Sequence, residues 1–514
     1  MRLSPVALRA ALPAPLCARA LLQRSRGPLV SSLSQSPYRA SISYRGISTT
    51  AARLGDEAGE RKWSTPLAER LAAAIDATEP MPLARYMRMC LTSDMGGYYT
   101  RGDLKEGHDQ FGVKGDFVTS PEISQIFGEL IGIWFIAEWM SQGRPSKGVE
   151  VIEVGPGRGT LMDDMLRTIQ RYPMAPAIDA IYMVEASAHL RNVQKNLLCG
   201  ADAQVSESKV GYHSICKRTG VPIVWAQTIE SIPKDPTKMP FIVAHEFFDA
   251  LPIHAFQAVK VTPPTPPPPP PSSEGTTPAP PPSPPAKPSI QWREMVVTPV
   301  PAQPDLNATN PEPEFQMSLA NSSTRHSRYL PDSSPRFRRL KSVPDAVIEV
   351  CPDAALYATD FATRIGGSAK HPKQTPSGAA LILDYGTTDT VPINSLRGIR
   401  HHRLVSPFSE PGLVDLSADV DFPAVAEAAI RASEGVEVHG PVTQAEFLGR
   451  MGVRERAEQL VKAAGPERGP VVEQAWRRLV DGGVGGMGKL YKAMAILPEN
   501  EGKRRPVGFG GDVE

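Results

Sequence analysis

One stretch in the first third of the chain limits the possible folds more than any other feature. Residues 149–154 are an apolar run with Glu153 near its end, as expected for a strand buried in a parallel sheet. Glycines follow at 155, 157 and 159, and apolar residues then recur at helical spacing through 161–169. Glycine allows a tight turn close to a ligand, and a helix start offers free N–H groups. The stretch therefore predicts the first half of a nucleotide-binding βαβ unit.

The spacing of the glycines indicates which ligand this unit binds. A dinucleotide fingerprint, G-x-G-x-x-G, would need a glycine at position 160, where the sequence has Thr160. The pattern is instead an acid followed by G-x-G-x-G, formed by Glu153, Gly155, Gly157 and Gly159. It resembles the first motif of the Rossmann-like methyltransferases that bind S-adenosyl-L-methionine. We therefore predict that these four residues bind this cofactor, with a plain tight turn as the alternative.

The next predicted strand supports the same interpretation. Residues 180–184 form a second apolar run, which ends in Glu185. An acidic residue after the second strand can accept hydrogen bonds from both ribose hydroxyls of an adenosine group. We predict this role for Glu185, and the alternative is a solvent-facing glutamate that begins the next helix.

Composition excludes several other classes of protein. The 514 residues are 41% hydrophobic and 22% charged, which is typical of a soluble globular protein. A net charge of +1 gives no indication of nucleic-acid binding. The five cysteines are scattered without a C-x-x-C pair, so we expect no metal site and no disulfide framework. The apolar segment 123–140 contains Glu129 and Glu138, and it is predicted to be a core helix, leaving no transmembrane segment.

The N-terminal residues differ in composition from the rest of the chain. Residues 1–55 contain eight arginines and nine serines but no Asp, Glu or Lys, as in a mitochondrial transit peptide. We predict that residues 1–47 are removed on import, and a disordered basic tail is the alternative. Their removal would change the formal net charge from +1 to about −6, because seven arginines are lost.

Two low-complexity segments interrupt the catalytic domain predicted for residues 62–500. The segment 262–289 is proline-rich, with 15 prolines between 263 and 288, and such a tract excludes helix and central strand. It is predicted to join two hairpin strands, 254–261 and 290–297. Residues 299–342 are predicted to be irregular. A strand at 487–497 is predicted to close the sheet at its edge.

Five sequence blocks identify a family. In chain order they read GDFVTSPEISQIFGELIGIW, VIEVGPGRGTLMDDMLR, AHEFFDALPIHAFQ, ALILDYG and DLSADVDF. They resemble the MidA-like mitochondrial protein arginine methyltransferases, which are assembly factors of respiratory complex I. The resemblance covers roughly residues 80–260 and 340–497. One departure is His245, because relatives often have asparagine before the following glutamate.

The resemblance implies a fold and an activity. The fold would be α/β, a seven-stranded Rossmann-like S-adenosylmethionine-dependent methyltransferase fold with extra N-terminal and C-terminal helices. The activity would be symmetric dimethylation of an arginine on a core subunit of complex I, in the mitochondrial matrix, during assembly.

Two carboxylates after the fourth predicted strand are candidates for catalysis. A guanidinium is protonated at physiological pH, so a site must hold it bidentately and accept a proton as it reacts. Glu246 and Asp249 follow the strand at 241–244 and lie at the carboxyl edge of the sheet. The alternative is that both residues cap a following helix. Weaker candidates for lining the substrate groove are Asp116, Glu122 and Asp384.

Two other functional classes compete with a methyltransferase. Thr160 disfavours an NAD-dependent oxidoreductase. A non-catalytic complex I assembly chaperone that retains the fold is the stronger rival, because an assembly factor can act by binding alone. The intact glycine turn with both Glu153 and Glu185 favours a cofactor site that is in use.

Overall fold

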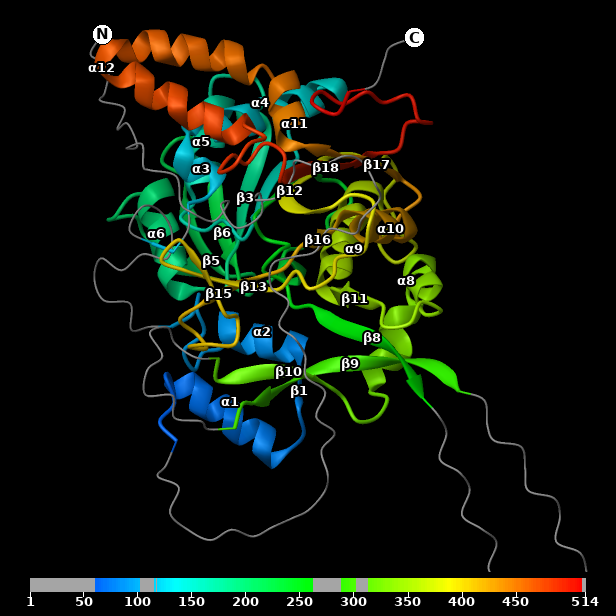
Figure 1. Cartoon of the computed structure of the whole chain (residues 1–514). Coiled ribbons are helices and arrows are strands. Elements are labelled where there is room, and N and C mark those ends of the chain that lie inside the picture. The colour runs from blue at the N-terminus through cyan, green and yellow to red at the C-terminus, as the bar shows by residue number, and fades with distance from the viewer. Residues whose placement is uncertain (1–60, 102–114, 117, 262–287, 302–312, 511–514) are drawn as a thin grey trace, which may run out of the picture.

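The computed structural model describes residues 61–101, 115–116, 118–261, 288–301 and 313–510 (Figure 1). The transit peptide predicted at residues 1–47 and almost all of the proline-rich segment lie outside these described residues.

A large twisted sheet forms the centre of the molecule. Seven strands lie side by side in the order β6 (Pro222–Ala226), β3 (Ile178–Val184), β2 (Val149–Val154), β7 (Met239–His245), β12 (Ala379–Thr387), β18 (Tyr491–Pro498) and β17 (Val436–Thr443). The first five are parallel, and β18 is antiparallel to both of its neighbours. Beyond β6, the short strands β5 (Tyr212–Ile215) and β4 (Ser206–Glu207) extend the sheet. This arrangement confirms the predicted Rossmann-like fold.

Helices cover both faces of this sheet, which explains why its strands are apolar on both sides. On one face lie α4 (Gln125–Ser141), α5 (Thr160–Ile169), α11 (Gln444–Arg450) and α12 (Val453–Val480). On the other face lie α9 (Pro352–Gly366) and α10 (Phe422–Ala432) (Figure 1). In β2, Val151 packs with the first group and Ile152 with the second. The core helix predicted at 123–140 is confirmed as α4, and none of the described helices is long and apolar enough to cross a membrane.

A second sheet is formed mainly by the chain segment between β7 and β12, together with β1 from the N-terminal part of the described chain. It consists of β1 (Met81–Pro82), β9 (Ser289–Pro299), β8 (His254–Val261) and β11 (Val347–Val350), with β10 (Phe315–Leu319) also paired to β9. Helices α1 (Pro66–Ala77) and α2 (Leu83–Thr92) pack against it through a shared apolar cluster. The β8–β9 hairpin predicted from sequence is confirmed, and Val261 pairs with Ser289 at its loop end.

Two expectations about the chain outside the main motifs were wrong. Residues 313–342 are ordered into β10, α7 (Arg325–Tyr329) and α8 (Pro335–Leu340), because β10 adds to the edge of β9 and Phe315 is fully buried. The C-terminal strand β18 lies inside the sheet, since β17 occupies the edge. The polar stretch around residues 397–417 forms a small sheet of β14 (Arg403–Val405), β13 (Arg397–Arg400) and β15 (Asp415–Ser417).

The pairing at the loop end of the hairpin makes a prediction about the proline tract. Replacing residues 263–287 with a six-residue Gly/Ser linker should leave the β8–β9 pairing intact, because Val261 and Ser289 already lie opposite each other. Each doubling of loop length costs only about 0.6 kcal/mol, so the free energy of unfolding should change by about 1 kcal/mol or less. Denaturant unfolding of the two proteins checks this. A loss of several kcal/mol would mean that the tract packs on the domain.

Candidate functional site

A large cavity lies at the carboxyl ends of the central parallel strands. Its volume is about 460 Å³, within the range of small-molecule sites. Its wall comes from the turns after β2, β3 and β7, from the loop before α4, and from β12, β15 and β18. The predicted residues that line it are Glu153, Gly155, Gly157, Glu185, Glu246 and Asp249. Six of the seven predicted site residues therefore share one cavity, and Gly159 lies just behind its wall.

The turn after β2 requires glycine at each of its three glycine positions. Gly155, Gly157 and Gly159 have φ values of +65°, +53° and +81°, a region that other L-residues rarely adopt. A β-carbon on Gly155 would lie 2.5 Å from the Phe247 ring. Gly159 is the N-cap of α5, so the free N–H groups of that helix face the turn.

Gln194 connects the glycine turn to the second acidic residue. Its side-chain amide donates to the carbonyl of Gly157 at 2.7 Å and to the Glu185 carboxylate at 3.1 Å, and its oxygen accepts from the Trp225 indole at 3.0 Å. The backbone N–H of Ser187 donates to the other oxygen of Glu185 at 2.8 Å. Glu185 is therefore fixed in orientation beside the turn, not solvent-facing.

The first acidic residue, Glu153, is buried and incompletely hydrogen-bonded. Its Oε2 atom has no hydrogen-bond partner among the described residues. Burial, followed by the nearby Glu185 charge, raises the pKa of Glu153 well above its usual range, and burial raises that of Glu185 to about 7. An unsatisfied carboxylate oxygen on a cavity wall is costly without a ligand. The glycine cradle, the oriented Glu185 and this oxygen fit a bound adenosyl cofactor.

Thr160, which argued against a dinucleotide site, has a role in assembling the wall. Its hydroxyl donates to Glu122 at 2.6 Å, and Arg158 lies 3.7 Å from the same carboxylate. Glu122 belongs to the short helix α3 (Ser120–Ile123), which precedes α4. These contacts hold α3 against the glycine turn, and Glu122 lines the cavity.

Glu246 occupies a strained position at the end of β7. Its φ of +49° is unusual for a residue other than glycine and costs on the order of 1–3 kcal/mol. Its backbone N–H donates to the carbonyl of Leu383 in β12 at 2.9 Å. Its carboxylate lies 3.2 Å from His245 Nε2 and accepts from the Ser120 N–H at 3.4 Å. No helix follows Glu246, because the next element is β8, so the helix-cap alternative for Glu246 and Asp249 is wrong.

A second acidic pair, Asp249 and Asp415, also lines the cavity. Asp249 accepts a hydrogen bond from the Tyr385 hydroxyl. Asp415 accepts a hydrogen bond of 2.9 Å from the Tyr99 hydroxyl. The N–H of Ala418 donates to the carbonyl of Asp249 at 2.9 Å, which brings the chain after β15 next to the turn after β7. The cavity thus presents the carboxylates of Glu246, Asp249 and Asp415 to one space.

Desolvation dominates the electrostatics of this acidic end. Burial, opposed by the Tyr385 hydrogen bond and assisted by the Glu246 charge, raises the pKa of Asp249 to about 6. Burial and the Asp249 charge raise the pKa of Asp415 well above its usual range. The nearby guanidinium of Arg397 stacks on Tyr385 at 4.4 Å and pairs with Asp419 at 2.8 Å. The acidic end therefore favours a cationic ligand.

Sequence reasoning misassigned two carboxylates and missed three residues. Asp384 is fully buried beneath the wall, where it accepts hydrogen bonds from the backbone N–H groups of residues 247–249 at 2.9–3.3 Å. Asp116 is bound by the Tyr98 hydroxyl at 2.7 Å and the His401 N–H at 2.6 Å, so it supports the loops outside the wall. Asp415, Tyr99 and Tyr385 were missed, because only tertiary folding places them beside β7.

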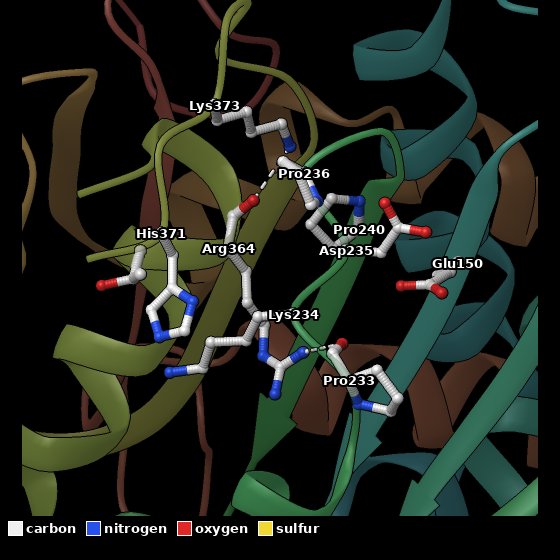
Figure 2. Close-up of a pocket in the computed structure, with 10 residues that line it drawn as sticks. Glu150, Pro233, Lys234, Asp235, Pro236, Pro240, Arg364, His371 and Lys373 are labelled. Carbon is white, nitrogen blue, oxygen red and sulfur yellow. Dashed lines mark hydrogen bonds between the residues drawn. The ribbon is translucent and has the colours of Figure 1, made fainter. Parts of the chain in front are cut away.

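A much smaller cavity lies at the amino ends of the central strands (Figure 2). Its volume is about 10 Å³, and Glu150 at the start of β2 and Pro240 at the start of β7 line it. The Lys373 ammonium there donates to three backbone carbonyls at 2.9–3.0 Å, and burial lowers its pKa to about 8. These interactions join chain segments, and the space has room for little more than one water molecule.

Comparison with known proteins identifies the fold and the sequence family of the chain. Residues 130–442 match the sequence family described as "Putative S-adenosyl-L-methionine-dependent methyltransferase". A solved structure from Burkholderia thailandensis, bound to S-adenosyl-homocysteine, superposes with a TM-score of 0.58 at 21% identity, covering 87% of this chain and 92% of that one. That likeness concerns the fold alone. Fold and family define the class: an S-adenosyl-L-methionine-dependent methyltransferase.

Curated relatives narrow the class to one family. The mitochondrial protein arginine methyltransferase NDUFAF7 of Xenopus tropicalis is 34% identical over 447 residues, covering 84% of this chain and 86% of that protein. The Xenopus laevis protein of the same name is 36% identical over 412 residues, covering 78% of each chain. The human one is 32% identical, covering 84% of each chain. The chain belongs to the NDUFAF7 family of mitochondrial protein arginine methyltransferases, as its sequence blocks predicted.

The glycine turn makes a testable prediction about cofactor binding. Gly157→Val should abolish binding of S-adenosyl-L-methionine, because a β-branched residue is strained at φ +53° and would fill the space above the turn. Titration calorimetry on the folded variant measures this. Gly143→Val is the matched control, since Gly143 has φ +92° but no atom of the described residues lies within 4 Å of where its β-carbon would be. Equal affinity in wild type and Gly157→Val would remove the turn from the cofactor site.

Proposed function

We propose that this protein uses S-adenosyl-L-methionine to methylate an arginine side chain of a protein substrate, by symmetric dimethylation of a core subunit of respiratory complex I in the mitochondrial matrix. The observation that carries the proposal is the shared cavity. A glycine turn suited to an adenosyl cofactor and three carboxylates suited to a guanidinium open into the same 460 Å³ space.

At the cofactor end, four groups have distinct proposed roles. The backbone of the turn at Gly155, Gly157 and Gly159 lies against the cofactor, and the α5 N-terminus supplies N–H donors. Glu185, oriented by Gln194, accepts the ribose hydroxyls. Glu153 uses its unpaired oxygen to accept a hydrogen bond. When bound, the cofactor supplies an electrophilic methyl group on a sulfonium.

At the acidic end, Glu246 and Asp249 hold the guanidinium. Carboxylates accept its N–H groups bidentately, and such charge-assisted hydrogen bonds are about twice as strong as neutral ones. Their placement aligns one nitrogen toward the cofactor end, and alignment is the main requirement of an in-line displacement. The proton that leaves this nitrogen passes to a carboxylate of the pair. Asp415, held by Tyr99, adds a third carboxylate close to Asp249.

The family resemblance and the predicted transit peptide support the location, the substrate and the product in this proposal. The relatives are mitochondrial proteins by name, and residues 1–47 have the composition of a matrix-targeting segment. The family resemblance supports a complex I core subunit as substrate and symmetric dimethylation as product.

The direct experiment supplies the mature protein, residues 48–514, with labelled S-adenosyl-L-methionine and individual purified complex I core subunits. We expect label on one subunit, mapped by mass spectrometry to an arginine carrying one methyl on each terminal nitrogen. Cofactor binding without transfer to any subunit would favour the non-catalytic assembly chaperone.

Glu246→Gln separates a catalytic role from a structural one. The variant keeps the size and one acceptor but loses the charge, so methyl transfer should fall by at least about 100-fold. Cofactor affinity and melting temperature should stay near wild type, since no helix depends on Glu246. Glu437→Gln is the control, because Glu437 also pairs with a histidine but lies on the edge strand β17. Full activity in a destabilised Glu246→Gln protein would contradict the assignment.

The raised pKa of Asp249 predicts a pH dependence. Protonation removes the negative charge that the guanidinium needs, so kcat/KM should fall tenfold per pH unit below about pH 6. The raised pKa of Asp249 has the opposite effect on the free energy of unfolding. Because the folded protein binds this proton more tightly than the unfolded chain, the stabilisation from Asp249 is fully present below about pH 4 and is lost as the pH rises through about 6. Measuring kcat/KM against pH for wild type and Asp249→Asn checks the predicted fall in rate. If kcat/KM of Asp249→Asn still fell below pH 6 as in wild type, another group would be responsible.

A further inference from the structure

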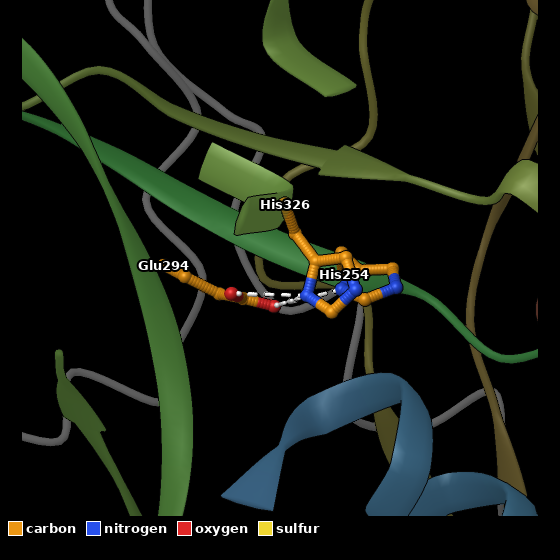
Figure 3. A group of neighbouring side chains, drawn as sticks. All are labelled: His254, Glu294 and His326. Carbon is orange, nitrogen blue, oxygen red and sulfur yellow. Dashed lines mark hydrogen bonds and ion pairs between the residues drawn. The ribbon is translucent and has the colours of Figure 1, made fainter. Parts of the chain in front are cut away.

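Outside the cavity, two histidines and a glutamate converge on one point (Figure 3). His254 begins β8, Glu294 lies in β9 and His326 lies in α7. His254 Nδ1 is 2.8 Å from Glu294 Oε1, and His326 Nδ1 is 3.2 Å and 3.3 Å from the two carboxylate oxygens. One potential ligand atom from each residue lies within 4.8 Å of the others.

The surroundings hold the carboxylate in place and leave one side open. Glu294 is fully buried, His254 is nearly so, and the His326 side chain is 41% exposed. The Thr324 hydroxyl donates a very short hydrogen bond to Glu294 Oε2 and also caps α7. Such an outer hydrogen bond orients a ligating carboxylate, and the exposed histidine leaves an entry path for an ion.

The separations suit a tetrahedral divalent ion. Zinc bonds to imidazole nitrogen and carboxylate oxygen are about 2.0–2.2 Å, which places neighbouring ligand atoms roughly 3.3 Å apart. The His326–Glu294 distances of 3.2 Å and 3.3 Å match this spacing. The His254–Glu294 distance of 2.8 Å is shorter, so that pair would open slightly around an ion.

A purely hydrogen-bonded cluster is the competing arrangement. In it, each Nδ1 carries a proton and donates to Glu294, and the carboxylate accepts from two histidines and Thr324. The imidazole rings of the two histidines lie 4.3 Å apart between centroids. In the metal-bound arrangement, a divalent ion instead takes a lone pair from each Nδ1 atom and is neutralised in part by the carboxylate.

We propose that His254, Glu294 and His326 form a structural binding site for a divalent transition-metal ion such as Zn²⁺, with water as the fourth ligand. The ion joins β8, β9 and the segment carrying α7, which the sequence predicted to be irregular. Because His254 lies two residues after Pro252 on the catalytic cavity wall, the site also anchors the end of the turn bearing Glu246 and Asp249.

The experiment uses the tag-free mature chain after dialysis against a chelator. Added Zn²⁺ should bind with one ion per chain by elemental analysis and should raise the melting temperature. Co²⁺ in its place should give the visible bands of a tetrahedral nitrogen and oxygen site, without the charge-transfer band of a thiolate ligand.

Two variants distinguish a metal site from a hydrogen-bonded cluster. His326→Gln keeps an N–H donor for Glu294 but removes a strong ligand, so it should fold normally without metal and lose at least tenfold in Zn²⁺ affinity. His439→Ala is the control and should bind like wild type, because His439 pairs with Glu437 on the edge strand β17, away from the cluster. Failure of the chelated wild type to bind, or equal binding by wild type and His326→Gln, would overturn the proposal. A thiolate band with Co²⁺ would do so as well.

Discussion

The central physical constraint in this molecule is the burial of carboxylates at the carboxyl edge of a parallel sheet. Glu153, Glu185, Asp249 and Asp415 are each less than 9% exposed. Each loses hydration that its hydrogen bonds only partly replace, and their pKa values rise as a result. Such a site stores unfavourable energy until a hydroxyl donor or a cation enters. An adenosyl group at one end and a guanidinium at the other would relieve it.

The fold maintains this arrangement from several directions. Asp384 binds three successive N–H groups of the turn after β7, which fixes Glu246 in its strained backbone conformation. Gln194 donates hydrogen bonds to both the glycine turn and Glu185, and so holds them beside each other. The small sheet of β13–β15 brings Asp415 to the cavity, where Tyr99, from the segment after α2, binds it, and β12 of the central sheet supplies Tyr385. The central sheet therefore provides the cofactor end and the carboxylates after β7, and the elements around it add Asp415 and Tyr99.

The central fold was accessible from local sequence because its signals are short-range. Apolar runs such as 149–154 must be buried on both faces, and three alternate glycines after such a run are compatible with few other backbone paths. The parallel strands then place Glu153, Glu185 and Glu246 at a common edge without further information. The ordered structure of residues 313–342 could not be predicted from local sequence, because β10 forms by pairing with β9 and its own composition does not indicate a strand.

The sequence by itself determined the strand, glycine turn and helix, the acidic residues after three strands and the family. Periodicity and backbone conformation depend on neighbouring residues, so they can be read locally. Tertiary structure alone decided that Asp249 meets Tyr385, that Asp415 joins it from 166 positions away along the chain, and that Asp384 supports the wall. It also decided that His254, Glu294 and His326 meet. Such contacts arise from the packing of distant segments, and no local pattern encodes which buried carboxylate will face a ligand and which will bind backbone.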